Sequence, residues 1–306
     1  MKWRLKSGAF RVLSAIQGGE AVYRFVQANI TRSIRPTRSR MEGKLCVALD
    51  YWAWIAANGH EDAVREGTHL DFGAGWHPTI PLTFHALGVK RQRLLDLEPL
   101  MKAPLIRKTA GLLQKNGLAL MKEAGFPAVQ PEPFVVTGQS ADELFGSVGI
   151  SYHAPYDGLL PRIAGEASLV TSTQVLLHIP EPILAKCFAE LFQALKPGGL
   201  FLATIHLQPL YGGLTNSTSA YRHLRYSPEE WERLGSKIMY YTRLKAPDYR
   251  RLLEKAGFEI PGWVVQPGSE KDYAAVKALP VHACFSGYST DDLAARHLFF
   301  SAQKPL

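Results

Sequence analysis

Residues 68–79 read Thr-His-Leu-Asp-Phe-Gly-Ala-Gly-Trp-His-Pro-Thr, and this stretch decides the fold. An apolar run that ends in Asp71 is followed by Gly73 and Gly75, which let the backbone turn sharply and approach a ligand. Pro78 then suits the first residue of a helix, because its missing N–H would be unpaired there. The pattern predicts a strand, a glycine loop and a helix whose N-terminus binds an anionic group.

A second apolar run, Leu94-Leu-Asp-Leu-Glu-Pro99, places Asp96 about 20 residues beyond the glycine loop. A carboxylate at this spacing is typical of a side chain that binds ribose hydroxyl groups. Dinucleotide-binding loops carry a third glycine three positions after the second, where this chain has Pro78. The two motifs therefore predict a nucleoside ligand and argue against NAD.

Short apolar runs alternate with helical patterns from Thr68 onward, which indicates βαβ units and a parallel sheet. Ligands of such sheets bind at the carboxyl ends of the strands, where the strand order reverses. Strands are predicted near 68–72, 93–97, 149–153, 168–173, 200–205, 259–265 and 297–303. Helices are predicted near 78–87, 104–124, 140–147, 181–195 and 246–256.

Several motifs in order resemble the class I S-adenosylmethionine (SAM)-dependent methyltransferases over residues 68–306. They are the loop from Asp71 to Gly75, Asp96, the stretch 169–180, the turn 195–199 and the stretch 249–258. The resemblance implies an α/β fold with a doubly wound, Rossmann-like sheet of seven mostly parallel strands, the last one antiparallel. It also implies that the protein is an enzyme that transfers a methyl group from SAM, with no metal required.

The resemblance assigns the cofactor site residue by residue. The glycine loop holds the methionyl part of SAM, Asp96 binds the ribose and Leu97 flanks the adenine. Where the family often has a further glycine this chain has His77, so the place of the methionine carboxylate is left open. The cofactor-binding residues implied are Asp71, Gly73, Ala74, Gly75, Asp96, Leu97, Ala154, Pro155 and Thr173.

Three histidines, His153, His178 and His206, lie at the carboxyl ends of predicted strands. Methyl transfer is an in-line displacement that needs alignment and, for a hydroxyl acceptor, a base. Histidine is the natural base near neutral pH. His178 and His206 are the candidate catalytic residues, although the family often carries a histidine at position 178 that only packs near the cofactor.

The acceptor is predicted by elimination to be a small molecule. Residues 171–174 read Thr-Ser-Thr-Gln, where methylation of a DNA base amino group would call for an Asn/Asp-Pro-Pro-Tyr motif. No cysteine follows a proline, as the nucleophile of cytosine methylation would. A hydroxyl of a sugar, lipid-linked glycan or secondary metabolite remains, and no nucleic acid is expected, but fold and cofactor do not by themselves fix a substrate.

The net charge of +8 belongs to residues 1–44, which hold ten lysines and arginines against two acidic residues. The start of this arm resembles an amphipathic helix with a basic face, which indicates either contact with a membrane surface or packing on the body. Arg11 and Gln17 interrupt its apolar run, so no secretory signal is predicted. Three separate cysteines indicate a reducing compartment, and we expect a cytoplasmic protein.

Residues 1–66 are predicted to form the basic arm and a helical cap, and residues 67–306 the methyltransferase domain. The cap has helical patterns over 19–32 and 41–58, joined by an arginine-rich connector around Pro36. Tyr51, Trp52 and Trp54 form an aromatic stripe in the second helix that is typical of core packing.

Two connections, 207–244 and 266–296, are longer than a compact domain needs. The first is rich in Tyr, Arg and His, which favours a substrate lid over a linker. A nucleotide-dependent oxidoreductase and a non-catalytic scaffold of the same fold remain as alternatives. The oligomeric state is not predicted.

Overall fold

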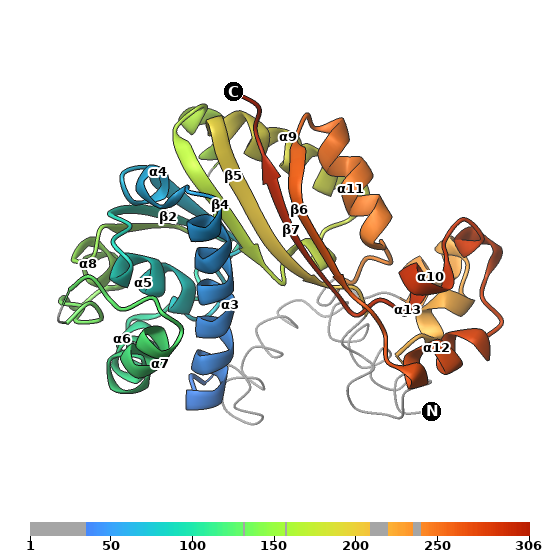
Figure 1. Ribbon diagram of the computed structural model, residues 1–306, viewed down its shortest axis with the longest axis horizontal. Helices are drawn as coiled ribbons and strands as arrows, with labels where there is room; N and C mark the ends of the chain where they lie inside the picture. Colours follow the sequence, from blue (N-terminus) through green and yellow to red (C-terminus); the bar gives the residue numbers. More distant parts are fainter. Residues whose placement is uncertain (1–34, 131, 157, 209–219, 235–239) are drawn as a thin grey trace. The chain divides into compact units, whose positions relative to one another are not determined.

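The computed structural model describes residues 35–130, 132–156, 158–208, 220–234 and 240–306 (Figure 1). Most of the basic arm and the predicted helix over 19–32 lie outside the described residues. The described part contains no helix of the length and apolarity that crossing a membrane requires.

The centre of the fold is a seven-stranded sheet in the order β3-β2-β1-β4-β5-β7-β6. β1 pairs in parallel with β2 and β4, and β2 pairs in parallel with β3. The strands are β1 (Thr68–Phe72), β2 (Arg91–Leu95), β3 (Ile150–His153), β4 (Ala167–Thr173), β5 (Leu195–His206), β6 (Glu259–Gln266) and β7 (His297–Gln303).

β7 runs antiparallel to β5. The Gly198 amide, near the start of β5, donates to the Lys304 carbonyl just past the end of β7, at 2.9 Å. The Leu207 amide, just past the end of β5, donates to the Arg296 carbonyl just before β7, also at 2.9 Å. The sheet is therefore mostly parallel with an antiparallel last strand, and the predicted doubly wound α/β fold is confirmed.

Helices flank the sheet (Figure 1). The predicted helix 104–124 is a continuous run of α6 (Ala103–Leu112), a π-helical turn η2 (Leu113–Gly117) and α7 (Leu118–Glu123). The α-helices are α3 (Arg38–Ala57), α4 (Glu61–Arg65), α5 (Thr79–Ala86), α6 (Ala103–Leu112), α7 (Leu118–Glu123), α8 (Ala141–Gly146), α9 (Glu181–Ala194), α10 (Pro228–Leu234), α11 (Ala246–Lys255), α12 (Glu270–Lys277) and α13 (Thr290–Ala294).

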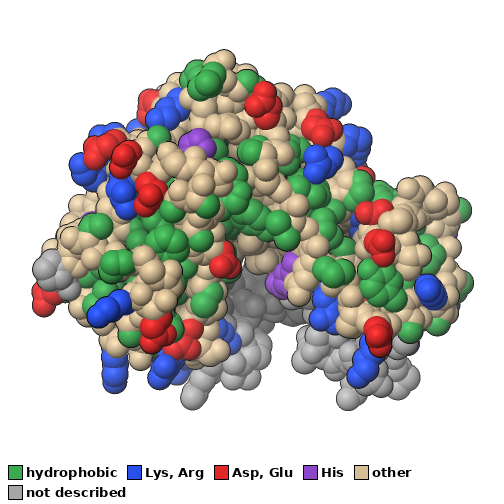
Figure 2. All heavy atoms as spheres, in the orientation of Figure 1, with side chains coloured by type: hydrophobic (Ala, Val, Ile, Leu, Met, Phe, Trp, Pro, Cys, Tyr) green, Lys and Arg blue, Asp and Glu red, His purple; other side chains and the backbone are tan. Residues whose placement is uncertain are grey.

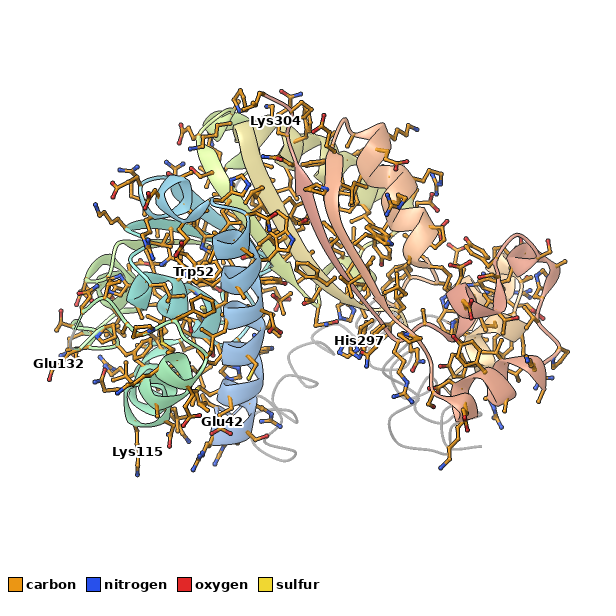
Figure 3. The ribbon with its side chains drawn as sticks, in the orientation of Figure 1. Glu42, Trp52, Lys115, Glu132, His297 and Lys304 are labelled. Atoms are coloured by element: carbon orange, nitrogen blue, oxygen red, sulfur yellow. The ribbon has the colours of Figure 1, made fainter. Side chains whose placement is uncertain are left out.

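The described chain forms two compact units. The N-terminal unit comprises Ile34–Thr173, Glu190–Leu202 and Gln303–Leu306, and the C-terminal unit contains Gln174–Ala189 and Ala203–Ala302. Within the N-terminal unit, Trp52 of α3 is buried against Phe84 of α5, with ring centroids 5.9 Å apart (Figure 3). Tyr51 is also buried, whereas Trp54 is only partly buried, so two of the three aromatic residues belong to the core.

Several predicted boundaries were wrong. α3 begins at Arg38 rather than near 41, because Thr37 caps it by accepting a hydrogen bond from the Arg40 amide. β2 ends at Leu95, which leaves Asp96 just outside the strand. β5 begins at Leu195 instead of 200, because the predicted turn 195–199 already pairs with the chain after β7. Pro78 precedes α5 as its N-cap.

The second long connection, predicted as a loop over 266–296, is largely helical. Ser269 and Ser289 each begin a helix with a capping box, in which an aspartate three residues later bonds back to the serine amide. The first connection contains α10 and the short helix η7 (Arg222–Arg225). Side chains from both connections form one buried cluster: Tyr221, Leu224, Ala275, Val276, Phe285, Leu293 and Ala294. The two insertions therefore pack together as one body.

Candidate functional site

The glycine loop is held against the end of β2 by its own backbone. Gly73 and Gly75 adopt φ angles of 81° and 71°, which glycine reaches without steric cost. The amides of Gly73 and Ala74 donate to the Leu95 carbonyl at 2.9 and 3.0 Å. A Cβ on Gly75 would meet only the Gly73 carbonyl oxygen, at 4.0 Å, so the side of the loop that this Cβ would occupy is open.

Asp96 holds the glycine loop through a hydrogen bond from the loop backbone. Its Oδ2 accepts a hydrogen bond from the Gly75 amide at 2.7 Å, and its Oδ1 accepts one from the Glu98 amide at 3.2 Å. A carboxylate can accept about four hydrogen bonds, so it retains capacity for hydroxyl donors. Burial raises the pKa of Asp96 from its ordinary value, while the bonds from Gly75 and Glu98 act against this rise. The apolar side chain of Leu97, the next residue, is 80% exposed.

Asp71 is buried at the carboxyl end of β1, where its Oδ1 accepts a hydrogen bond from Thr171 Oγ1 at 2.9 Å. Burial raises the pKa of this carboxyl to about 6. Lys44 of α3 interacts electrostatically with both Asp71 and Asp96, and burial lowers the pKa of its ammonium group. Two carboxyl groups at the glycine loop therefore feel the charge of one cation from α3.

The carboxyl end of β4 is fixed by a second contact from α3. Tyr51 donates to the Ser172 carbonyl at 3.1 Å, and its hydroxyl lies 3.0 Å from Thr173 Oγ1. Ala154 and Pro155 follow β3 and are joined by a cis peptide bond, with Pro155 exposed. The cofactor residues suggested by the sequence thus all belong to the N-terminal unit, at the carboxyl ends of β1, β2, β3 and β4.

The two candidate bases belong to the C-terminal unit. His178 Nδ1 lies 2.9 Å from the Tyr240 carbonyl, so Nδ1 carries the hydrogen and Nε2 is the acceptor in the neutral ring. Burial lowers the pKa of His178. The ring of His206 packs against that of His297 in a tilted arrangement, with ring centroids 4.0 Å apart, and burial lowers the pKa of His206 to about 4 (Figure 3). Both rings are therefore neutral at pH 7.

The sequence of residues 38–261 matches the family described as "Methyltransferase domain". The chain belongs to this family. It is a SAM-dependent methyltransferase, as the resemblance predicted, and the oxidoreductase alternative is wrong. No curated protein matches the sequence.

The methyltransferase is also similar to solved structures of other methyltransferases. They include one assigned as a sarcosine dimethylglycine methyltransferase of Galdieria sulphuraria, with 16% identity, 83% of this chain and 84% of that chain covered, and a TM-score of 0.42. The magnesium protoporphyrin IX methyltransferase of Synechocystis has 14% identity, coverage of 86% and 84%, and a TM-score of 0.41. The geranyl diphosphate C-methyltransferase of Streptomyces coelicolor has 11% identity, coverage of 81% and 77%, and a TM-score of 0.40.

Sequence reasoning missed Lys44 and the hydroxyl of Tyr51 in the methyltransferase. Both project from α3, which lies before the motifs that carry the resemblance. Lys44 looks like one more charge of the basic arm, and Tyr51 like part of the core stripe. The one available signal is their spacing of seven residues, which places both on one face of a helix.

We predict that Asp71→Asn stabilises the methyltransferase above pH 6 and weakens its binding of SAM. The folded-state pKa of Asp71 is raised to about 6, so ionisation opposes folding, and wild-type stability falls as pH rises from 4 toward 6. The amide avoids this loss, worth roughly 1–3 kcal/mol. Urea unfolding at pH 4 and pH 7 measures the difference, with exposed Asp62→Asn as control. A gain equal at both pH values would contradict the assigned ionisation.

Proposed function

We propose that the methyltransferase transfers the methyl group of SAM to a hydroxyl of a small molecule, such as a sugar, glycan or secondary metabolite. The observation that supports this choice is the fixed tautomer of His178, whose Nε2 is left as an acceptor by the bond from Nδ1 to the Tyr240 carbonyl. A hydroxyl acceptor needs a group that takes its proton. A neutral imidazole supplies that group.

The residues at the glycine loop fit SAM. The open side of Gly75 leaves room for the methionyl part, and Asp96 keeps acceptor capacity for the ribose hydroxyls. Because His77 stands where the family often has a glycine, the sequence left the place of the methionine carboxylate open. Lys44 offers a cation for that carboxylate. Leu97, Ala154 and Pro155 are assigned to the adenine, and Thr173 to the floor below the sulfonium.

When bound, SAM supplies an electrophilic methyl group on a positively charged sulfur. The protein has to align an acceptor oxygen with that methyl group, keep water out and take one proton. We assign the proton to Nε2 of His178, with His206 as the alternative base. The substrate lid over residues 207–244 that the sequence predicts stays a proposal.

The distribution of charge also supports a small-molecule acceptor over a nucleic acid. Basic and acidic side chains are mixed over the face of the protein seen in Figure 2, whereas a surface that binds the phosphate backbone of a nucleic acid carries a basic patch or stripe.

The boundary between a cap of residues 1–66 and the domain 67–306 stays a proposal, as does a cytoplasmic location.

Asp96→Ala is expected to weaken SAM binding by about 1–3 kcal/mol, because it leaves ribose hydroxyl groups unpaired and releases the Gly75 amide. Isothermal titration with SAM, S-adenosylhomocysteine and NADH measures this. Glu98→Ala, two residues further on, is the matched control, with affinity close to wild type. Equal affinity of Asp96→Ala and wild type would remove the ribose assignment.

His178→Gln should lower kcat by roughly 10²–10⁴-fold with unchanged SAM affinity, because only proton removal is lost. Wild-type kcat should fall as pH drops through the lowered pKa of His178 and stay flat above it, since the base must be unprotonated. The assay follows labelled methyl transfer to a panel of hydroxylated acceptors. A loss confined to His206→Gln would move the base to His206, and transfer to amines alone would contradict O-methylation.

The basic residues before α3 are proposed to hold the protein weakly on anionic membrane surfaces. Co-sedimentation with phosphatidylserine vesicles should be stronger for the full chain than for a form that starts at Arg35, which keeps α3 and its cap. Added salt should abolish the difference, because charge attraction is screened. Equal sedimentation of both forms at low salt would rule out this contact.

A further inference from the structure

Four polar side chains lie in a row across the buried face of three parallel strands. His69 and Asp71 of β1 are two residues apart and point to the same face. Their register partners are Gln92 of β2, opposite His69, and Thr171 of β4, opposite Asp71. Each of the four is at most 4% exposed. Central parallel strands normally carry apolar residues on both faces, so this row needs an explanation.

The row is a continuous chain of hydrogen-bonding contacts. Gln92 Nε2 donates to the Pro81 carbonyl at 2.8 Å, and Gln92 Oε1 lies 2.9 Å from His69 Nδ1. His69 Nε2 lies 2.7 Å from Thr171 Oγ1, which lies 2.9 Å from Asp71 Oδ1. The chain therefore runs from α5 through the sheet to the carboxyl group at the glycine loop.

This row of hydrogen bonds fixes how many protons its four side chains hold. The Pro81 carbonyl orients the Gln92 amide, so Oε1 faces His69 and Nδ1 must carry a hydrogen. If Asp71 is ionised, Thr171 donates to it, and His69 Nε2 must donate to Thr171, which makes the ring an imidazolium. If Asp71 is protonated, it donates to Thr171, Thr171 donates to Nε2, and the ring is neutral.

Both arrangements contain the same number of protons and satisfy every contact. If the proton shared by Asp71 and His69 is removed, one of two contacts is left without a hydrogen. The contact is either the one between His69 Nε2 and Thr171 Oγ1, at 2.7 Å, or the one between Thr171 Oγ1 and Asp71 Oδ1, at 2.9 Å. A buried polar contact without a hydrogen is costly. Asp71 and His69 are therefore best satisfied when they share one proton.

The surroundings bias the position of the proton. His69 packs on the ring of Phe84, and burial lowers its pKa to about 4, which favours the neutral ring. The charged groups that act on Asp71 are Lys44 from α3 and Asp96 beyond β2, which have opposite effects. A further cation beside Asp71 would favour the carboxylate and so drive the proton toward His69.

We propose that Asp71, Thr171 and His69 form a proton relay that ionises Asp71 when the cationic end of SAM binds and stores the released proton on His69. The inference rests on the proposed function, in which the glycine loop that begins after Asp71 holds the methionyl part of SAM, and it places Asp71 beside that part. The Asp71 O–H bond breaks as Thr171 gains that hydrogen, and the Thr171 O–H bond breaks as His69 Nε2–H forms. No proton enters or leaves the protein. His69 and Thr171 act as positioning residues, through Asp71.

The relay has a measurable consequence for pH dependence. With the relay intact, SAM binding below the pKa of Asp71 releases no proton to solvent, and its affinity stays flat with pH. Without the relay, the proton on Asp71 must leave, so affinity falls by up to about tenfold per pH unit below that pKa.

Thr171→Val removes the relay hydroxyl while keeping the shape of the side chain. Thr109→Val is the matched control, because Thr109 of α6 is equally buried and its Oγ1 lacks a hydrogen-bond partner among the described residues. Titration calorimetry with SAM, in two buffers of different ionisation heat at a pH below the Asp71 pKa of about 6, counts the protons released. We expect release close to zero for wild type and Thr109→Val, and release approaching one proton for Thr171→Val. Equal release by wild type and Thr171→Val would overturn the relay.

A second measurement needs neither SAM nor a variant. Nitrogen NMR of the His69 ring and carbon NMR of the Asp71 carboxyl, followed with pH in the free wild-type protein, should show one shared midpoint. Independent midpoints would overturn the relay. A wild-type protein that fails to bind SAM would contradict the proposed cofactor site instead, and the shared midpoint would then decide the relay by itself.

Discussion

The position of β1 between β2 and β4 is the constraint on which the site depends. Parallel pairing on both sides brings the carboxyl ends of the three strands to one edge of the sheet. Asp71, Asp96 and Thr173 thereby become neighbours although they are far apart in the sequence. The bond from the Gly75 amide to Asp96 then closes the loop over β2. A one-residue slip in β1 would turn Asp71 to the other face and remove the site.

The sequence predicted the sheet and the loop well because those signals are local. The apolar run between Gly67 and Gly73 locates β1, and the apolar run after Gly165 locates β4 almost to the residue. Two glycines with an acid at fixed spacing locate the loop. The errors lie where pairing with a distant strand decides the boundary. Leu195–Gly199 reads as a turn because of Pro197, Gly198 and Gly199, and becomes strand only through the chain after β7.

Contacts between distant segments also explain what was missed at the site. Lys44 and Tyr51 are ordinary helix residues until α3 packs over the sheet, and nothing local marks them. The helices of the second insertion had a local signal, the Ser-x-x-Asp pairs at Ser269 and Ser289. Their role in one core with the first insertion could not be deduced, because apolar side chains do not specify which distant partner they meet.

The polar row through β1 shows a conflict between stability and binding. Apolar residues of similar volume would pack the same face without desolvating a carboxyl group and an imidazole, and such replacements are often neutral or stabilising in other proteins. Only Thr171 bonds to Asp71 directly, and His69 and Gln92 continue the row of contacts behind Thr171. A carboxyl group needed only for structure would not require a partner that can take its proton. The arrangement is explained if Asp71 must change its charge while remaining buried.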